Sequence, residues 1–308
     1  MNVTVNHFFE SWKKSVLDAV KNDENIKSEN LSDSIILVNY LTYIRKCIPY
    51  PVKIVESPEI LDTIPGELKE SYDQIKKRLT TGQGVAPYLS NKAKNLVFDG
   101  LFLDWNILHL HLGMIDSNGH VSRTGTTLHL TINDGTVYFI KLGHHGPTAY
   151  TDVSELKTIY KNWPSLLNVV GVTLDQGVTE NDRFDLRKHG VIQITTFDDE
   201  NGTSVSVIPK RALYSTAKTS MYDQELLDIS IPNLIKSIIE LGRKELHEDF
   251  PSDAEFVYFP KEHRFIFGIL DSERQFVKIF FGIDSLSFWR HIFTNYKEII
   301  IFPNHQTK

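Results

Sequence analysis

The sequence predicts an α+β fold in which a helical N-terminal region is followed by antiparallel sheets with packed helices. Three observations support this class. Apolar residues recur at helical spacing near the N-terminus, residues alternate with a period of two in the middle of the chain, and shorter alternating runs occupy the C-terminal part. At 308 residues the chain exceeds the usual size of one domain, so we expect two or three domains.

The N-terminal region is expected to be mainly helical. Its first helix is indicated by apolar residues at helical spacing: Phe8, Phe9, Trp12, Val16, Leu17 and Val20. Ser32 can cap a second helix, because its hydroxyl can accept a hydrogen bond from a free backbone amide. A short extended stretch over residues 52–55 and a polar helix over 67–79 follow, and Gly82 ends that helix.

The middle of the chain predicts one antiparallel sheet. Three runs alternate as a half-buried strand does: 107–112, 127–132 and 137–142. Asp134 and Gly135 between the second and third runs form a pair that tight hairpins favour. Leucines and isoleucines would occupy one face of this sheet. The opposite face would carry His109, His111, His129, Lys141 and Phe139.

The elements after this sheet are also expected to mix helices and strands. A helix should begin at Thr151 or Asp152 and run through Trp163, with Glu155 completing a capping box. A hairpin with an acidic turn, a long helix and a phenylalanine-rich C-terminal sheet should follow. The expected regions are 1–88, mainly helical; 89–170, the sheet with the candidate active site; 171–222, a hairpin and basic loop; and 223–308, a helix and antiparallel sheet.

The composition and charge of the chain indicate the compartment in which the protein works and the partners it is expected to have. A net charge of −6 argues against a uniformly basic nucleic-acid-binding surface. The single cysteine, Cys47, cannot form an internal disulfide, which fits a reducing compartment. The N-terminal residues lack the pattern of a signal peptide, and no apolar run is long enough to span a bilayer. We therefore expect a cytoplasmic protein without a membrane partner.

The histidine-bearing face is the best candidate for a chemical site. Internal cleavage of RNA needs a base for the 2′-hydroxyl, a cation for the phosphate and an acid for the leaving oxygen, and histidine can serve as base or acid. Asp104 and Trp105, just before the first strand, can help to frame a pocket. No cofactor is needed for this chemistry. The candidate catalytic residues are His109, His111, His129, Lys141, Arg123 and His145.

The pattern of elements around this face resembles RelE-like and BrnT-like bacterial endoribonuclease toxins. A helix precedes three antiparallel strands, an arginine stands before the second strand, and the third ends in histidines. The resemblance covers about residues 89–165. It implies a metal-independent endoribonuclease of toxin or phage-defence type. Its catalytic positions would correspond to Arg123, His129, Lys141 and His144 or His145.

Two other interpretations of the histidines stay open. The segment 141–146 resembles a local motif of metallo-β-lactamase-like nucleases, which would make the protein a metal-dependent hydrolase. However, Leu112 and Gly113 stand where that family has Asp-His after its His-x-His motif. Alternatively, the histidines are covered by another part of the chain, hydrogen-bonded and chemically idle.

Two basic stretches without acidic residues indicate an anionic ligand. They contribute the candidate nucleic-acid-binding residues Lys76, Lys77, Arg78, Lys92, Lys94, Lys210, Arg211 and Lys218. RNA or DNA and a regulatory protein are the expected partners. A protein that binds nucleic acid or another protein through these stretches without catalysis is therefore the alternative to a nuclease.

Overall fold

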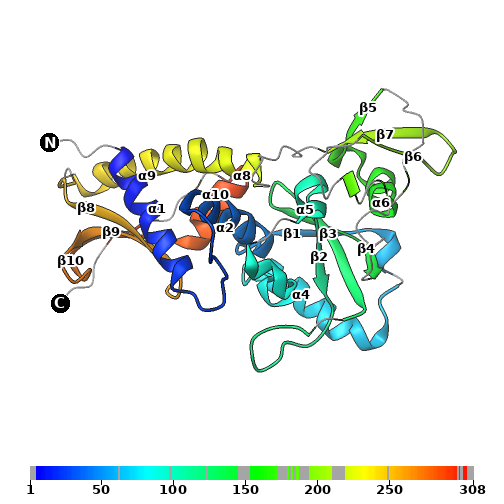
Figure 1. Ribbon diagram of the computed structural model, residues 1–308, viewed down its shortest axis with the longest axis horizontal. Coiled ribbons are helices and arrows are strands. Elements are labelled where there is room, and N and C mark those ends of the chain that lie inside the picture. The colour runs from blue at the N-terminus through cyan, green and yellow to red at the C-terminus, as the bar shows by residue number, and fades with distance from the viewer. Residues whose placement is uncertain are drawn as a thin grey trace. The chain divides into compact units, whose positions relative to one another are not determined.

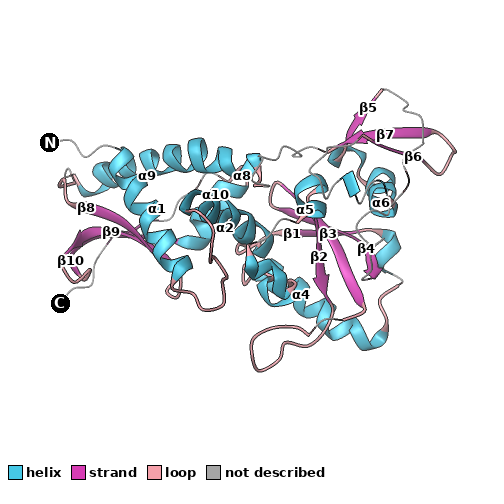
Figure 2. Ribbon diagram, in the orientation of Figure 1, coloured by secondary structure: helices cyan, strands magenta, loops and turns pink. Residues whose placement is uncertain are grey.

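The computed structural model describes residues 5–61, 63–96, 99–122, 124–144, 153–171, 194–209, 219–247, 250–296 and 301–303, and the single residues 179, 182, 185, 186 and 298. It has an α+β fold, with helices and three mainly antiparallel sheets among these residues (Figure 2). The expected fold class is therefore confirmed. Within the same ranges, no helix has both the length and the apolar character that crossing a bilayer requires.

The chain forms two compact units. The first contains residues 1–45, 94–96 and 223–308, and the second contains residues 46–93 and 97–222. This division differs from the boundary expected after residue 88. The reason is that the first helix packs on the C-terminal sheet, where Ser11 accepts a hydrogen bond from the amide of Phe256, whereas residues 46–88 pack on the central sheet.

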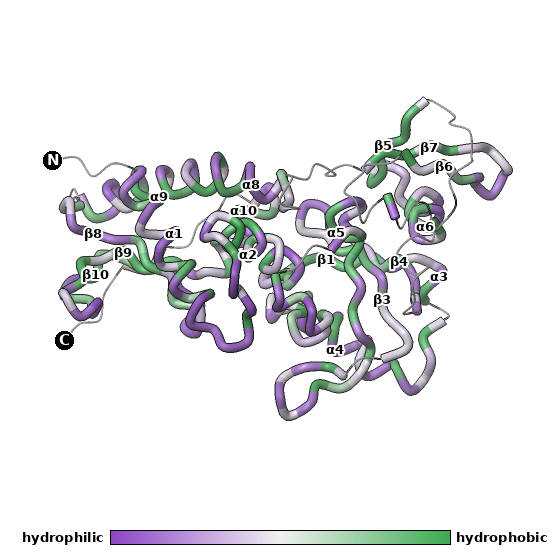
Figure 3. The backbone as a smooth tube through the Cα atoms, in the orientation of Figure 1, coloured by the Kyte–Doolittle hydropathy of each residue, from purple (hydrophilic) through white to green (hydrophobic). Residues whose placement is uncertain are grey.

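The first unit is a sheet covered by helices. Its strand order is β11–β10–β9–β8, all antiparallel. The strands are β8 (Ala254–Phe259), β9 (Arg264–Leu270), β10 (Phe276–Asp284) and β11 (Ile301–Pro303). The helices are α1 (Val5–Lys21), α2 (Asp33–Cys47), α8 (Met221–Glu225), α9 (Ile231–Leu246) and α10 (Ser285–Phe293), and a π-helical turn, Leu226–Ser230, joins α8 to α9. The last two residues of α2 and the first two of α8 belong to the second unit. Along α9, hydrophobic residues lie on one side of the coil and hydrophilic residues on the other (Figure 3).

The second unit contains the predicted histidine sheet. Its strand order is β1–β4–β3–β2, with β1 parallel to β4 and the other pairs antiparallel (Figure 1). The strands are β1 (Lys53–Glu56), β2 (Ile107–His111), β3 (Thr126–Asn133) and β4 (Thr136–His144). Asp134 and Gly135 have φ angles of 44° and 71°, so the tight hairpin predicted between β3 and β4 is confirmed.

Helices and a second small sheet cover this central sheet. The helices are α3 (Pro58–Leu61), α4 (Lys69–Thr81), α5 (Gly100–Trp105) and α6 (Ser154–Asn162), with short 3₁₀ turns at 66–68, 86–88, 91–95 and 164–166. The small sheet has the order β5–β7–β6, from β5 (Asn168–Val170), β6 (Thr195–Asp198) and β7 (Ser204–Ile208). Tyr72 of α4 packs against Phe139 on one face of the central sheet, and Trp163 after α6 packs against Tyr138 on the other.

The placement of Phe139 on the histidine face was wrong. His129 pairs with Lys141 but Leu130 pairs with Phe139, so β4 carries one extra residue, Ile140, at this point. This β-bulge reverses the alternation, so Phe139 lies with the leucines and Tyr138 lies on the histidine face.

The predicted capping box before α6 includes Asp152, which, like Thr151, lies outside the described residues. The residue that directly precedes α6 is Val153, and its side chain makes no capping hydrogen bond. The carboxylate of Glu155 turns towards the central sheet, where it has a hydrogen-bonding partner.

Candidate functional site

Three histidines gather on one face of the central sheet, as the alternation predicts. His109 of β2 lies directly opposite His129 of β3, and His111 lies opposite Thr127. The ring centroid of His109 is 6.3 Å from that of His111 and 6.3 Å from that of His129. His109 therefore occupies the centre of the cluster.

A buried carboxylate orients His129. The Nδ1 atom of His129 lies 2.8 Å from Oε1 of Glu155, and its Nε2 atom lies 3.0 Å from Oγ1 of Thr127. A carboxylate only accepts hydrogen bonds, so Nδ1 carries the hydrogen and donates it. In the neutral ring, Nε2 then accepts the hydroxyl hydrogen of Thr127. Both ring nitrogens are therefore engaged, and the tautomer is fixed.

Lys141 joins the same group of side chains. Its Nζ atom donates a hydrogen bond of 2.8 Å to Oγ of Ser154, the first residue of α6. The Ser154 hydroxyl in turn lies 3.5 Å from Oε2 of Glu155, which is a long contact. Two adjacent residues of α6, Ser154 and Glu155, thus contact the ammonium group of Lys141 and the imidazole of His129 on the sheet.

His109 is held as a neutral base. Burial lowers the pKa of its imidazole from 6.5 to about 4, and the neighbouring His129, Lys46 and His111 act in the same direction, although Asp99 opposes them. The imidazole therefore carries no charge at neutral pH and can accept a proton. His109 is partly exposed, whereas His111 and His129 are only 3% and 2% exposed.

A partly buried ion pair borders His109. Nζ of Lys46 donates a hydrogen bond of 3.0 Å to Oδ2 of Asp99, whose other oxygen accepts from the amide of Phe102 at the start of α5. Burial alone would raise the pKa of Asp99, but Lys46, His109 and these hydrogen bonds hold it below its ordinary value. The carboxylate therefore stays charged beside the histidines.

His111 is fixed by the connection between β2 and β3. Its Nδ1 atom accepts a hydrogen bond of 3.3 Å from the backbone amide of Thr124. Because this nitrogen is an acceptor, the other one carries the hydrogen in the neutral ring. Burial and this bond suit a supporting role better than direct contact with a substrate.

Some of the predicted residues cannot be placed. Arg123, His145, Lys210, Arg211 and Lys218 lie outside the described residues, so their assignments remain sequence-based predictions. His144, the last residue of β4, is exposed. Among the residues that the structure describes, no group of three or more histidine, cysteine, aspartate or glutamate side chains is arranged to hold a metal ion.

The first basic stretch is partly used within the fold. Lys76 forms an ion pair of 2.7 Å with Glu56, which also accepts a hydrogen bond from Tyr72. Arg78 donates to the backbone oxygens of residues 83 and 84 and so stabilises the end of α4. Lys77 and Lys92 are exposed, and Lys94 is partly buried.

Sequence reasoning missed the two α6 residues and the Lys46–Asp99 pair. Glu155 was interpreted as a capping residue because it stands three after Asp152, and that spacing cannot show that the side chain reaches another strand. The sequence feature that could have indicated the role of Glu155 was its place, as a carboxylate, on the helix that follows the histidine-bearing strands.

Comparison with models of protein families, with curated proteins and with solved structures finds no match to this chain. The case for a function therefore depends on the geometry of the site.

Proposed function

We propose that the protein is a cytoplasmic, metal-independent endoribonuclease of toxin or phage-defence type. The single observation that carries this proposal is the continuous group Lys141–Ser154–Glu155–His129 beside the neutral imidazole of His109. It combines a proton acceptor, a cation and an oriented histidine, which are the groups that cleavage at a 2′-hydroxyl requires.

His109 and Lys141 would contact the substrate, because both are partly exposed whereas His111 and His129 are buried. The imidazole of His109 takes the proton of the 2′-hydroxyl, and the 2′-oxygen attacks the phosphorus. Lys141 stabilises the extra negative charge on the phosphate oxygens. The bond to the 5′-oxygen breaks, and that oxygen takes a proton from an acid, for which His145 is the sequence-based candidate.

The remaining side chains would position the reacting ones. Glu155 fixes the ring of His129 on one side of His109, and Ser154 holds the ammonium group of Lys141. Because Ser154 and Glu155 are adjacent on α6, a shift of this helix would displace both contacts together.

The test is an RNA-cleavage assay with purified full-length protein in the presence of a chelator. The expected products are a 2′,3′-cyclic phosphate and a free 5′-hydroxyl. His109→Ala and Lys141→Ala should each lower the rate on the order of 10²-fold or more. His263→Asn is the matched control, because His263 is exposed and has a positive φ of 52°, which asparagine tolerates. Full activity in a triple variant of His111, His129 and Lys141 to alanine would refute the proposal.

A second candidate is a protein that binds nucleic acid or a protein partner without catalysis. The burial of His111 and His129 favours it, because hydrogen-bonded histidines inside a fold are commonly structural. Salt-dependent RNA or DNA binding without product formation, weakened by Lys77→Ala and Lys92→Ala, would support this candidate over the nuclease.

A further inference from the structure

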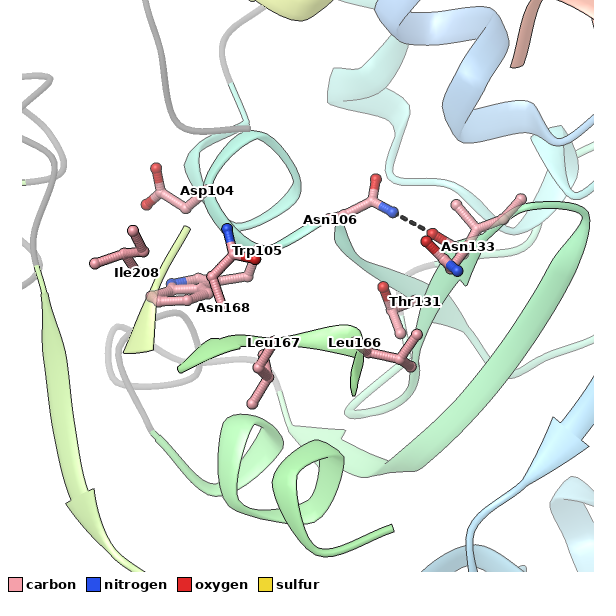
Figure 4. A pocket seen from close by; sticks show the side chains of 10 residues that line it. Asp104, Trp105, Asn106, Thr131, Asn133, Leu166, Leu167, Asn168 and Ile208 are labelled. Carbon is pink, nitrogen blue, oxygen red and sulfur yellow. Dashed lines mark hydrogen bonds between the residues drawn. The ribbon is translucent and has the colours of Figure 1, made fainter. Parts of the chain in front are cut away.

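A pocket lies at the Asn133 end of the histidine face. It is formed within the second unit by residues around Trp105, including Thr131, Asn133, Leu166, Leu167 and Asn168. Trp105 and Asn168 lie at one end of the pocket, and Thr131 and Asn133 lie at the other (Figure 4). Leu166 lies beside Thr131, and Leu167 lies between the two ends (Figure 4).

The pocket shares β3 with the candidate catalytic group. Thr131 and Asn133 follow His129 at alternate positions, so all three side chains point to the same face. At roughly 3.3 Å per residue, Thr131 stands about 7 Å and Asn133 about 13 Å from His129 along the strand. A ligand in the pocket would therefore lie beside the residues assigned to phosphate chemistry.

The lining combines an aromatic surface with amide groups. The indole of Trp105 and the side chain of Leu167 are apolar surfaces against which a flat ring can stack. The carboxamides of Asn133 and Asn168 are both exposed, and each offers a donor and an acceptor. Stacking on an aromatic residue together with hydrogen bonds to the base edge is the usual means of recognising an unpaired RNA base.

The charge of the lining residues and the volume of the cavity restrict the kinds of ligand that the pocket can bind. The pocket lining includes the carboxylate of Asp104 and, among the described residues, no lysine or arginine, so it suits a neutral base better than a phosphate group. The cavity is small, with a volume of about 50 Å³, so it suits one six-membered ring better than the two fused rings of a purine.

One hydrogen bond fixes the wall of the pocket next to Asn133. The amide nitrogen of Asn106 donates a bond of 2.6 Å to the backbone oxygen of Ile132 (Figure 4). Asn133 follows Ile132 directly and is exposed. A ring stacked on Trp105 would thus present its edge to Thr131 and Asn133.

We infer that this pocket binds a pyrimidine base. The inference rests on the proposed function for the source of the base, which would be a single-stranded RNA with its phosphate near Lys141. The same chemistry would also suit a free pyrimidine nucleotide.

The experiment is a calorimetric titration of the full-length protein with uridine and cytidine monophosphates, adenosine monophosphate and ribose 5-phosphate. Pyrimidine nucleotides should bind, and ribose 5-phosphate should not. Trp105→Leu should weaken binding roughly 5- to 100-fold, because base stacking on an aromatic ring contributes about 1–3 kcal/mol. Asn133→Ala should weaken it about 2- to 10-fold, the effect of one hydrogen bond. Asn118→Ala, an exposed asparagine in the connection from β2 to β3, is the matched control.

Two further arms identify the source of the base. Binding of hexauridylate that is lost in its abasic counterpart would assign the base to an RNA chain, and binding of the mononucleotide alone would assign it to a free nucleotide. Either result supports a base-binding pocket.

The outcome can be separated from that of the proposed function by titrating wild-type protein with uridine, which has no phosphate group to cleave or to contact Lys141. Binding of uridine, whether or not wild-type protein cleaves RNA, would support the pocket, and absence of uridine binding would count against it. The inference is overturned if wild-type protein binds no pyrimidine, if it binds the purine equally well, or if Trp105→Leu and Asn133→Ala both leave the affinity unchanged. The exposed Asn133 keeps the test informative should Trp105→Leu fail to fold.

Discussion

The imidazole of His129 and the carboxylate of Glu155 form a buried hydrogen bond of 2.8 Å between β3 and α6. The contact joins a strand to a helix that lies 26 residues further along the chain. It therefore has two roles that can be measured separately. It fastens α6 to the sheet, and it fixes the ring of His129 beside His109.

Glu155→Ala should destabilise the protein by about 1–3 kcal/mol, because the buried Nδ1–H of His129 loses its acceptor. Glu155→Gln should cost less, since its amide oxygen can still accept that hydrogen bond. Urea unfolding of both variants measures the difference. Glu67→Gln, at an exposed position of the same unit, should change stability by less than about 0.5 kcal/mol. Equal stability of Glu155→Ala and wild type would show that the contact does not fasten the helix.

The sequence was sufficient to predict three strands of the central sheet, but not that β1 joins it as a parallel fourth strand, nor what covers the sheet. The alternation around His109 and His129 placed both on one face, because a strand has only two faces. It could not reveal the bulge at Ile140, which depends on how β3 and β4 pair rather than on either strand alone. The partner of His129 comes from a separate helix, so local periodicity carries no information about it.

Gly143 is required by the position of His129. A Cβ atom at this residue would stand 2.6 Å from Cε1 and 2.9 Å from Cδ2 of the imidazole, closer than real contacts allow. Gly143→Ala should therefore displace the ring, lower the thermal midpoint by several degrees and reduce any RNA cleavage. Gly125→Ala, also in the second unit, is the control, because a Cβ there would meet no atom within 4 Å. If the two variants unfold at the same temperature, the proposed packing of His129 on Gly143 is wrong.

The free energy of unfolding should decrease as the pH is lowered from 6.5 to 4, because the folded protein resists protonation of His109. The folded protein lowers the pKa of this imidazole from 6.5 to about 4, so over this interval the unfolded chain binds a proton that the folded chain excludes. The loss should reach at most about 3 kcal/mol near pH 4, and it should vanish above pH 7 where both states are neutral. Unfolding of wild type and His109→Gln across this range measures it. A difference between them that stays constant with pH would contradict the assignment.

Breaking a second buried contact, in the first unit, should cost more stability than breaking an exposed ion pair. Arg45 donates from Nε and Nη2 to the two carboxylate oxygens of Asp223 at 3.0 and 2.9 Å, and both side chains are buried. The hydroxyl of Thr42 donates to the same carboxylate at 2.6 Å. Removal of one member leaves an uncompensated buried charge, so Asp223→Ala should cost about 3–5 kcal/mol of unfolding free energy.

The matched control for this pair is Asp18→Ala in α1, which removes an exposed contact of 3.4 Å with Lys14 and should cost less than about 1 kcal/mol. High salt should weaken the Lys14–Asp18 contact but not the buried one, because mobile ions screen only charges that water reaches. Chemical unfolding at two salt concentrations therefore tests both expectations. A cost for Asp223→Ala as small as that for Asp18→Ala would mean that the buried arginine relaxes to solvent when its partner is lost. In that case α2 and α8 are held together by apolar packing rather than by the ion pair.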